Sequence, residues 1–200
     1  MASEHYFTPQ PSARGRAACF TTTLRGWTVR LTTEAGVFSR RRVDAGTRLL
    51  VENLEVGSRD RLLDLGCGYG VLGIIAALLA PEGQVTLVDI NERAVELARR
   101  NLRANGIENA EVFQGDGFAP LPGRVFDVIA LNPPIRAGRE VVCRLIEESR
   151  EHLVAGGRFY LVGRRRQGVV RLAEKMGEVF GEVEELARRG GYRVYRSHRR

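Results

Sequence analysis

Residues 61–73 have the sequence RLLDLGCGYGVLG, a short apolar run that ends beside an acid and continues into closely spaced glycines. Residues 61–65 predict a buried strand and the residues after the glycines predict a helix. Gly66, Gly68 and Gly70 let the backbone turn sharply between them and approach a ligand with no Cβ in the way. Ligands bind at this carboxyl end of a strand in an open parallel sheet, so the stretch predicts a fold and a site together.

Short apolar runs alternate with helical patterns on the carboxyl side of this turn. We expect strands at 61–65, 84–89, 110–114, 125–131 and 157–163, and helices at 71–80, 91–105, 138–152 and 168–179. Such alternation predicts an α/β fold with parallel strands joined by crossover helices. Segments 182–187 and 192–197 are separated only by residues 188–191, so they must form an antiparallel pair at the end of the sheet.

The amino-terminal side has a different pattern. Residues 20–24 and 27–31 alternate with period two around Arg25-Gly26, which predicts a β-hairpin. Asp44 is placed to cap a helix that runs to about Asn53. Before the hairpin, the chain has no apolar periodicity and is expected to be an arm with little core.

Composition restricts the class of protein. The chain has 200 residues, of which 44% are hydrophobic, enough for one domain with a substantial core. The longest apolar stretch, 74–80, is far too short to cross a bilayer, and no signal-peptide core is present, so we expect a soluble, cytoplasmic protein with no membrane partner. Three cysteines and three histidines are scattered without ligand spacing, so neither a disulfide framework nor a metal site is predicted. Cys67 is interpreted as a packing residue in the glycine turn.

The chain carries a formal net charge of +7, with arginine runs at 40–42, 164–166 and 188–189. Clustered arginine favours a polyanionic partner, and RNA or DNA is the natural candidate. The alternative is a general compositional preference for arginine, since Lys175 is the only lysine.

Acids follow three successive strands of the predicted sheet. Asp64 beside the glycines suits a ligand with an ammonium group and disfavours a pyrophosphate, although residues 68–73 match the GxGxxG dinucleotide pattern. Asp89 lies 19 residues after Gly70 (89 − 70 = 19), close to the spacing of a ribose-binding acid, unless it only caps the next helix. Asp116 lies where an adenine amine would be met, or it forms a turn.

Residues 132–135, NPPI, directly follow the apolar run 126–131 and suggest a reaction. Two prolines fix the backbone beyond the strand end and hold Asn132 there. The Asn132 amide and the carbonyl of Pro133 can both accept hydrogen bonds from one NH2 group, such as the exocyclic amine of a nucleobase. In isolation the motif is more simply a rigid turn, but its place one strand beyond the predicted pocket favours amine binding.

The glycine turn, the three acids and the NPP motif, in this order, resemble the class I S-adenosylmethionine-dependent methyltransferases. Within them the chain is most similar to the RsmC-like group of ribosomal RNA guanine-N2 methyltransferases, and the likeness extends upstream to 36–39 and 44–47. It implies a Rossmann-like, doubly wound, seven-stranded sheet in the order 3-2-1-4-5-7-6 with the last strand antiparallel. It also implies that residues 1–53, including the hairpin, pack on an S-adenosylmethionine-binding methyltransferase domain at 54–200.

The same resemblance assigns expected roles to single residues. The glycine turn wraps the methionine part of the cofactor, Asp89 holds the ribose, and Asp116 borders the adenine. The expected cofactor-binding residues are Asp64, Gly66, Cys67, Gly68, Gly70, Asp89, Ile90, Asp116, Gly117 and Asn132, with Phe38 and Thr47 from upstream. The expected catalytic residues, which present the target amine, are Asn132, Pro133, Pro134 and Ile135. The expected partner is ribosomal RNA or the small ribosomal subunit.

Two departures leave the substrate open. Many amine methyltransferases have an aromatic residue where this chain has Ile135, so stacking on the target is weak or comes from Phe38. The degenerate amino-terminal copy of the two-domain ribosomal enzymes is not found here. Glutamine-N5 and adenine-N6 methyltransferases share the NPP motif and remain alternatives. So do a hydride-transfer enzyme and an RNA-binding module that retains the pocket without catalysis.

Overall fold

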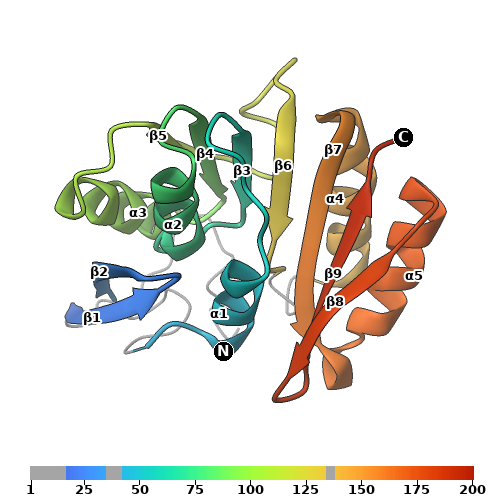
Figure 1. The fold of residues 1–200 in the computed structure, drawn as a ribbon, viewed down its shortest axis with the longest axis horizontal. Helices are drawn as coiled ribbons and strands as arrows, with labels where there is room; N and C mark the ends of the chain where they lie inside the picture. Colours follow the sequence, from blue (N-terminus) through green and yellow to red (C-terminus); the bar gives the residue numbers. More distant parts are fainter. Residues whose placement is uncertain (1–16, 35–41, 134–137) are drawn as a thin grey trace, which may run out of the picture.

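The computed structural model describes residues 17–34, 42–133 and 138–200, and a seven-stranded sheet forms its centre (Figure 1). Across the sheet the strands are β5 (Ala110–Gln114), β4 (Gln84–Asp89), β3 (Arg61–Leu65), β6 (Phe126–Leu131), β7 (Leu153–Arg164), β9 (Tyr192–His198) and β8 (Glu184–Arg189). β9 runs in the direction opposite to the other six strands of this sheet. Counted from β3, this is the order 3-2-1-4-5-7-6, so the predicted topology is confirmed.

Helices cover both faces of the sheet, and each face has its own apolar cluster. The first cluster includes buried side chains of α1 (Ala45–Glu52), α2 (Val71–Leu79) and α3 (Glu92–Ala104), and the second those of α4 (Arg139–Glu151) and α5 (Val169–Phe180). The helices predicted after the glycine turn begin and end within one residue of α2 to α5. None of the helices in the described part of the chain is both long and apolar enough to cross a membrane.

The predicted hairpin is present as β1 (Ala18–Leu24) and β2 (Trp27–Thr33). Its turn has positive φ at both Arg25 (51°) and Gly26 (83°), as a two-residue connection between right-twisted strands requires. Asn101 of α3 fixes β2 to the domain, because its side chain both accepts from Thr32 N (2.8 Å) and donates to Thr32 O (2.9 Å). The buried side chains of Leu24, Val29 and Leu31 join the first apolar cluster.

Two strand predictions near the carboxyl terminus were wrong at their ends. The strand expected at 157–163 begins at Leu153, because Leu153 pairs with Phe126 before a register shift, and Gly156 accommodates the irregularity with φ of 75°. The strand expected at 182–187 is β8, which continues to Arg189. Gly190 and Gly191 both have positive φ, so two residues suffice for the turn that four were expected to make.

The sheet brings the predicted site residues together at the carboxyl ends of its parallel strands. β3, β4, β5 and β6 are adjacent and parallel, so Asp64, Asp89, Asp116 and Asn132 all lie at or just beyond the carboxyl end of their strands. Asp44, as predicted, caps α1 at the same end, where its side chain accepts from the backbone N–H groups of residues 46 and 47.

Candidate functional site

The glycine turn between β3 and α2 forms the floor of a cavity. Gly66, Gly68 and Gly70 have φ of 74°, 56° and 87°, values that favour glycine, and Gly66 N donates to Val88 O (2.8 Å) to tie the turn to β4. A Cβ at Gly66 or Gly68 would meet no atom within 4 Å, so both leave open space above the turn. A Cβ at Gly70 would lie 3.2 Å from Ala98 of α3. Gly66 and Gly68 therefore leave space for a ligand, whereas Gly70 allows the close packing of α3 against the turn.

Asp89 at the end of β4 holds the turn in place. Its Oδ2 accepts from Gly68 N (2.8 Å) and its Oδ1 accepts from Asn91 N (2.9 Å). Burial raises the pKa of Asp89, and these N–H groups oppose the rise. Asn91, not Asp89, caps α3, because Asn91 Oδ1 accepts from Arg93 N (3.0 Å) and Ala94 N (3.4 Å). The alternative that Asp89 merely caps the helix is therefore wrong, and its carboxylate still has acceptor positions for a ligand hydroxyl.

Asp64 lies deeper, at the end of β3, with 4% of its surface exposed. Its Oδ2 accepts from Gly73 N (2.9 Å) in the first turn of α2. Burial is the main cause that raises the pKa of Asp64 to about 7; the hydrogen bond from Gly73 lowers it and the charge of Asp89 raises it. Burial also raises the pKa of the neighbouring Cys67 thiol, which disfavours the thiolate that a nucleophile needs and agrees with a packing role.

Asp116, beyond β5, is bound to α4. Arg144 Nη2 donates to both carboxylate oxygens of Asp116 (2.8 and 2.9 Å), and Arg144 Nη1 donates to Glu148 (3.0 Å). Hydrogen bonding to Asp116 is the main cause that raises the pKa of Arg144. A Cβ at Gly117 would lie 2.7 Å from Leu145 Cδ2, so glycine permits the loop to approach α4 this closely. α4 therefore decides where the Asp116 carboxylate lies.

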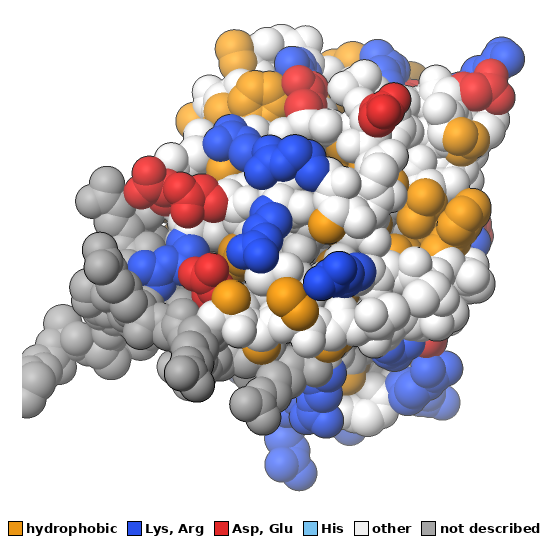
Figure 2. Space-filling view, turned by 90° about the vertical axis from the view of Figure 1, so that its left-hand side faces the viewer, with side chains coloured by type: hydrophobic (Ala, Val, Ile, Leu, Met, Phe, Trp, Pro, Cys, Tyr) orange, Lys and Arg blue, Asp and Glu red, His pale blue; other side chains and the backbone are white. Residues whose placement is uncertain are grey.

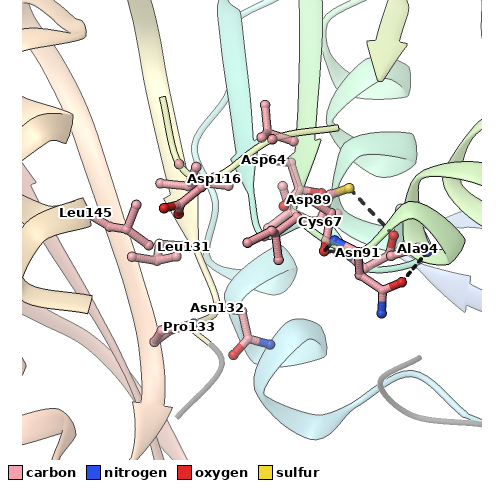
Figure 3. Close-up of a pocket in the computed structure, with 18 of the residues that line it drawn as sticks. Asp64, Cys67, Asp89, Asn91, Ala94, Asp116, Leu131, Asn132, Pro133 and Leu145 are labelled. Carbon is pink, nitrogen blue, oxygen red and sulfur yellow. Dashed lines mark hydrogen bonds between the residues drawn. The ribbon is translucent and has the colours of Figure 1, made fainter. Parts of the chain in front are cut away.

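Asn132 lies directly after β6, with its amide group beside the start of α1. Its Nδ2 donates to Thr47 Oγ1 (2.9 Å) and lies 3.5 Å from Asp44 Oδ2. Figure 3 shows the amide nitrogen on the side of α1 and the amide oxygen turned away from it, with Pro133 beside it. The oxygen is thus the end of the amide that does not face α1.

These elements surround one cavity of about 250 Å³, near the lower end of the size range of small-ligand sites. Eleven of the expected residues line it, namely Thr47, Asp64, Gly66, Cys67, Gly68, Asp89, Ile90, Asp116, Gly117, Asn132 and Pro133. Gly70 is not among the lining residues, since it packs on α3. The expected residues Phe38, Pro134 and Ile135 lie outside the described residues.

The sequence interpretation missed part of the cavity wall. α4 contributes Val141, Arg144 and Leu145, and the start of α3 contributes Asn91 and Ala94. The signal for α4 was the spacing i, i+3, i+4, which places three residues on one helix face but does not say which neighbour that face meets. The other missed residues are apolar or small neighbours of expected ones: Leu65, Tyr69, Val71, Leu72, Val88, Gly115 and Leu131.

The arrangement suits a ligand with several different polar groups. The buried carboxylate at the end of β3 and the partly buried one at the end of β4 can accept from ammonium and hydroxyl groups. The open space above Gly66 and Gly68 admits the ligand backbone. Asn132 also lines the cavity, and its amide group can both donate and accept hydrogen bonds.

Two arginine runs that are distant in sequence are close in the fold. Arg165 N donates to Gly191 O (2.9 Å), and Arg189 pairs with Tyr192 across β8 and β9. The two runs therefore lie together at the carboxyl ends of β7 and β8. We call their exposed residues the arginine ledge; they are Arg164, Arg165, Arg166, Arg188 and Arg189. Arg40 and Arg41 of the third run lie outside the described residues.

Basic residues are not confined to the ledge. Figure 2 shows the side of the molecule that carries α3 and the hairpin, where Lys and Arg side chains are spread among acids. The exposed arginines of β2 and α3 are Arg30, Arg99, Arg100 and Arg103.

Comparison with known proteins gives a consistent result. The family model described as the methyltransferase small domain matches residues 28–196. The protein YbxB of Bacillus subtilis, described as uncharacterized, is 38% identical over 197 residues, which are 98% of this chain and 98% of that protein. Ribosomal RNA small subunit methyltransferase C of Stutzerimonas stutzeri is 36% identical over 193 residues, which are 94% of this chain and 57% of that protein.

Among solved structures, the fold is similar to that of the T. thermophilus 16S rRNA N2 G1207 methyltransferase (RsmC) in complex with AdoMet and guanosine. The TM-score is 0.84 at 26% identity, covering 95% of this chain and 52% of the other. This chain thus spans about half the length of the ribosomal RNA methyltransferases that it matches.

Proposed function

The chain belongs to the methyltransferase small domain family, and from this premise we propose that it methylates an exocyclic amine of RNA, namely guanine N2 of ribosomal RNA. The family makes it an S-adenosylmethionine-dependent methyltransferase. The observation that carries the choice of an amine acceptor is the orientation of Asn132, whose NH2 group is used by Thr47 and whose oxygen remains for the acceptor.

The cavity residues fit S-adenosylmethionine. A side chain at Gly66 or Gly68 would occupy the open space above the turn, and the carboxylates of Asp64 and Asp89 can accept hydrogen bonds from an ammonium group and ribose hydroxyls. In this proposal Asp64 and the glycine turn hold the methionine part, Asp89 the ribose, and Asp116 with Gly117 the adenine. When bound, the cofactor supplies an electrophilic methyl group.

The protein's own contribution is to bind and orient the acceptor. Asn132 Oδ1 and the Pro133 carbonyl accept hydrogen bonds from the NH2 group and turn the nitrogen lone pair toward the cofactor side of the cavity. Positioning and partial removal of water supply most of the acceleration. An aryl amine becomes acidic once it is methylated, so its proton is lost to water and no strong base is needed.

Two observations support RNA as the substrate. The arginine ledge lies at the same end of the sheet as the cavity, where it can contact the phosphates that flank a bound nucleotide. Ribosomal RNA small subunit methyltransferase C of Stutzerimonas stutzeri is similar over 94% of this chain, and the similar 16S rRNA methyltransferase of T. thermophilus has been solved with guanosine. The guanine assignment rests on these similarities alone, because YbxB, which matches over 98% of its own length, is described as uncharacterized and indicates no substrate.

Asn132→Ala tests the function. The variant should lose methyl transfer while its affinity for S-adenosylmethionine stays within about threefold, because it removes the acceptor contact and leaves the residues proposed to hold the cofactor unchanged. Asn53→Ala is the matched control, since Asn53 caps the end of α1 and donates to Leu49 O outside the cavity. Activity of Asn132→Ala within about threefold of the parent would exclude the acceptor role.

The acceptor itself is identified by incubating the protein and labelled cofactor with ribosomal RNA, assembled small subunits, transfer RNA and release factor. Mass spectrometry then maps the modified group. N2-methylguanine in RNA is the expected product. Label only in protein would favour glutamine methylation, N6-methyladenine would change the base, and RNA binding without any labelled product would favour a non-catalytic module.

A further inference from the structure

We infer that Asp44 is a positioning residue for methyl transfer, which holds the Asn132 amide with its oxygen toward the acceptor amine. The inference rests on the proposed function, because it concerns how Asn132 meets its acceptor. Asp44 is 88 residues distant from Asn132 in the chain and is not among the residues that line the cavity.

Asp44 links the start of α1 to Asn132 through a small set of contacts. Its Oδ2 accepts from Gly46 N (2.9 Å) and Thr47 N (3.1 Å) and faces Asn132 Nδ2 at 3.5 Å. In its shorter hydrogen bond, Asn132 Nδ2 donates to Thr47 Oγ1 (2.9 Å). Asp44 therefore fixes the backbone of Thr47, whose hydroxyl binds the Asn132 amide, and its carboxylate also faces that amide directly.

The chemistry of a carboxylate decides which end of the amide faces α1. An ionised carboxylate only accepts hydrogen bonds, whereas an asparagine amide has one end that donates and one that accepts. A reversed Asn132 amide would place its oxygen against Asp44 Oδ2 and lose the favourable contact. The NH2 group must therefore face α1, and Oδ1 faces the other way, as Figure 3 shows.

Asp44 is itself held from a third element. Tyr192 of β9 donates its hydroxyl to Asp44 Oδ1 (2.9 Å), and the Arg164 guanidinium lies 4.6 Å from the centre of the Tyr192 ring. Burial is the main cause that raises the pKa of Tyr192; Arg164 lowers it and Asp44 raises it, and the phenol remains a donor. A Cβ at Gly46 would lie 2.7 Å from Tyr192 Cε1, so glycine allows this approach.

The arrangement affects the reacting nitrogen as well as its position. A hydrogen-bonded chain that ends on a carboxylate polarises the amide and increases the negative charge on Asn132 Oδ1. In the transfer, the acceptor nitrogen would use its lone pair to form the new N–C bond, and the electron pair of the broken carbon–sulfur bond would stay on sulfur. The nitrogen would then release a proton to water. Until that proton leaves, the nitrogen is positively charged, and a more negative Oδ1 stabilises it.

Asp44→Ser and Asp44→Asn separate this role from helix capping, because serine, asparagine and aspartate are all good N-caps. Serine is too short to reach Asn132 and Tyr192 together, so Asp44→Ser should lower kcat by on the order of 10- to 100-fold, with KM for RNA and cofactor Kd within about threefold. Asp44→Asn keeps an oxygen toward the cap and loses the charge, so its kcat should fall between those of Asp44→Ser and the parent.

A control and a double variant complete the test. Asp60 also accepts a backbone N–H, from Gly57 (2.8 Å), but precedes β3 at the opposite end of the sheet, so Asp60→Ser should leave kcat unchanged. In an Asn132→Ala background, measured under single turnover, Asp44→Ser should cause little further loss, because it acts through Asn132. Equal losses in both backgrounds, or parental kcat in a folded Asp44→Ser, would overturn the inference.

Failure of the proposed function is distinguishable from failure of this inference. If the parent methylates another amine, the same variants are assayed on that acceptor. If the parent methylates none of the acceptors, the Asn132 side-chain amide is followed by ¹⁵N NMR, with its signals assigned by their loss in Asn132→Asp. Asp44→Ser should shift these signals and speed their exchange with water, and unchanged signals would show that Asp44 does not hold the amide.

Discussion

Replacing Asp64 by asparagine should remove a pH dependence of stability that the parent carries. The Asp64 carboxyl is buried, and its pKa is raised from an ordinary 3.8 to about 7, chiefly by burial. Because the folded-state pKa is the higher one, the folded protein keeps a proton that the unfolded chain has lost between these values. The stability that Asp64 contributes is therefore complete below about pH 4 and is lost as the pH rises to about 7.

The size of the effect follows from the shift. At 1.36 kcal/mol per pKa unit, a rise of about three units corresponds to a total of about 4 kcal/mol, of which about 2 kcal/mol is lost between pH 5 and pH 7. Asparagine has nearly the same shape, does not ionise, and can still accept from Gly73 N. The difference in unfolding free energy between Asp64→Asn and the parent should thus move by about 2 kcal/mol in favour of the variant over that interval, then become flat.

Urea unfolding of both proteins at about pH 5, 6, 7 and 8 measures this difference, and taking the difference cancels the groups that titrate equally in both proteins. A difference that stays constant within about 0.5 kcal/mol would refute the reasoning that Asp64 is protonated by burial. A cationic cofactor should favour the ionised carboxylate, so its affinity should rise with pH toward 7 by at most about tenfold per unit. Asp64→Asn should lose that slope in calorimetric titrations.

Three further substitutions test packing and the cavity wall. Gly73→Ala should lower the unfolding free energy by about 1–3 kcal/mol, because its Cβ would lie 2.4 Å from Leu87 Cδ2 in the core. The matched control is Gly177→Ala, whose Cβ would meet nothing nearer than 3.7 Å and which should raise the unfolding free energy by about 0.5–1 kcal/mol. Urea unfolding distinguishes the two variants, and equal effects would contradict the packing argument. Arg144→Gln should weaken cofactor binding severalfold, because Asp116 loses its partner. The change in Tm should be small, because the ion pair is largely exposed. An unchanged Kd for the cofactor would exclude a cofactor role for Asp116.

The arginine ledge has its own test in the same series. Arg165→Ser should reduce the slope of log Kd for RNA against log salt by about one, whereas Arg59→Ser, at the opposite end of the sheet, should leave it unchanged. Filter binding at several salt concentrations measures the slope. Equal slopes for both variants would show that the basic charge is a general property of the surface.

Much of the cavity could be predicted because its residues lie at strand ends. Asp64, Asp89 and Asn132 each follow an apolar run, and parallel strands place their carboxyl ends at one edge whatever the details of packing. Gly70 shows where such reasoning stops. Its positive φ was predictable from the turn, but whether it faces a ligand or Ala98 depends on where α3 packs.

Residues from separate elements could not be assigned to the site from the chain alone. Asp44 was predicted only as a helix cap, and nothing in its neighbourhood indicates Asn132 or Tyr192 as partners. Arg144 lies on a helix whose orientation is set by the apolar cluster on its face of the sheet. Its pair with Asp116 therefore appears only in the folded chain.

The sequence by itself determined the alternation of strands and helices, the glycine turn, and the acids and asparagine at the strand ends, while the strand order came from the family resemblance that these features carry. These are properties of local period, backbone freedom and parallel topology, which a chain carries in its residue order. Only the tertiary structure decided that burial raises the pKa of Asp64, that α4 holds Asp116, and that α1 and β9 hold Asp44 behind Asn132. Burial and side-chain contacts between distant elements depend on how the helices pack on the sheet. That packing is set by the whole fold, so the residues near each position in the chain do not reveal it.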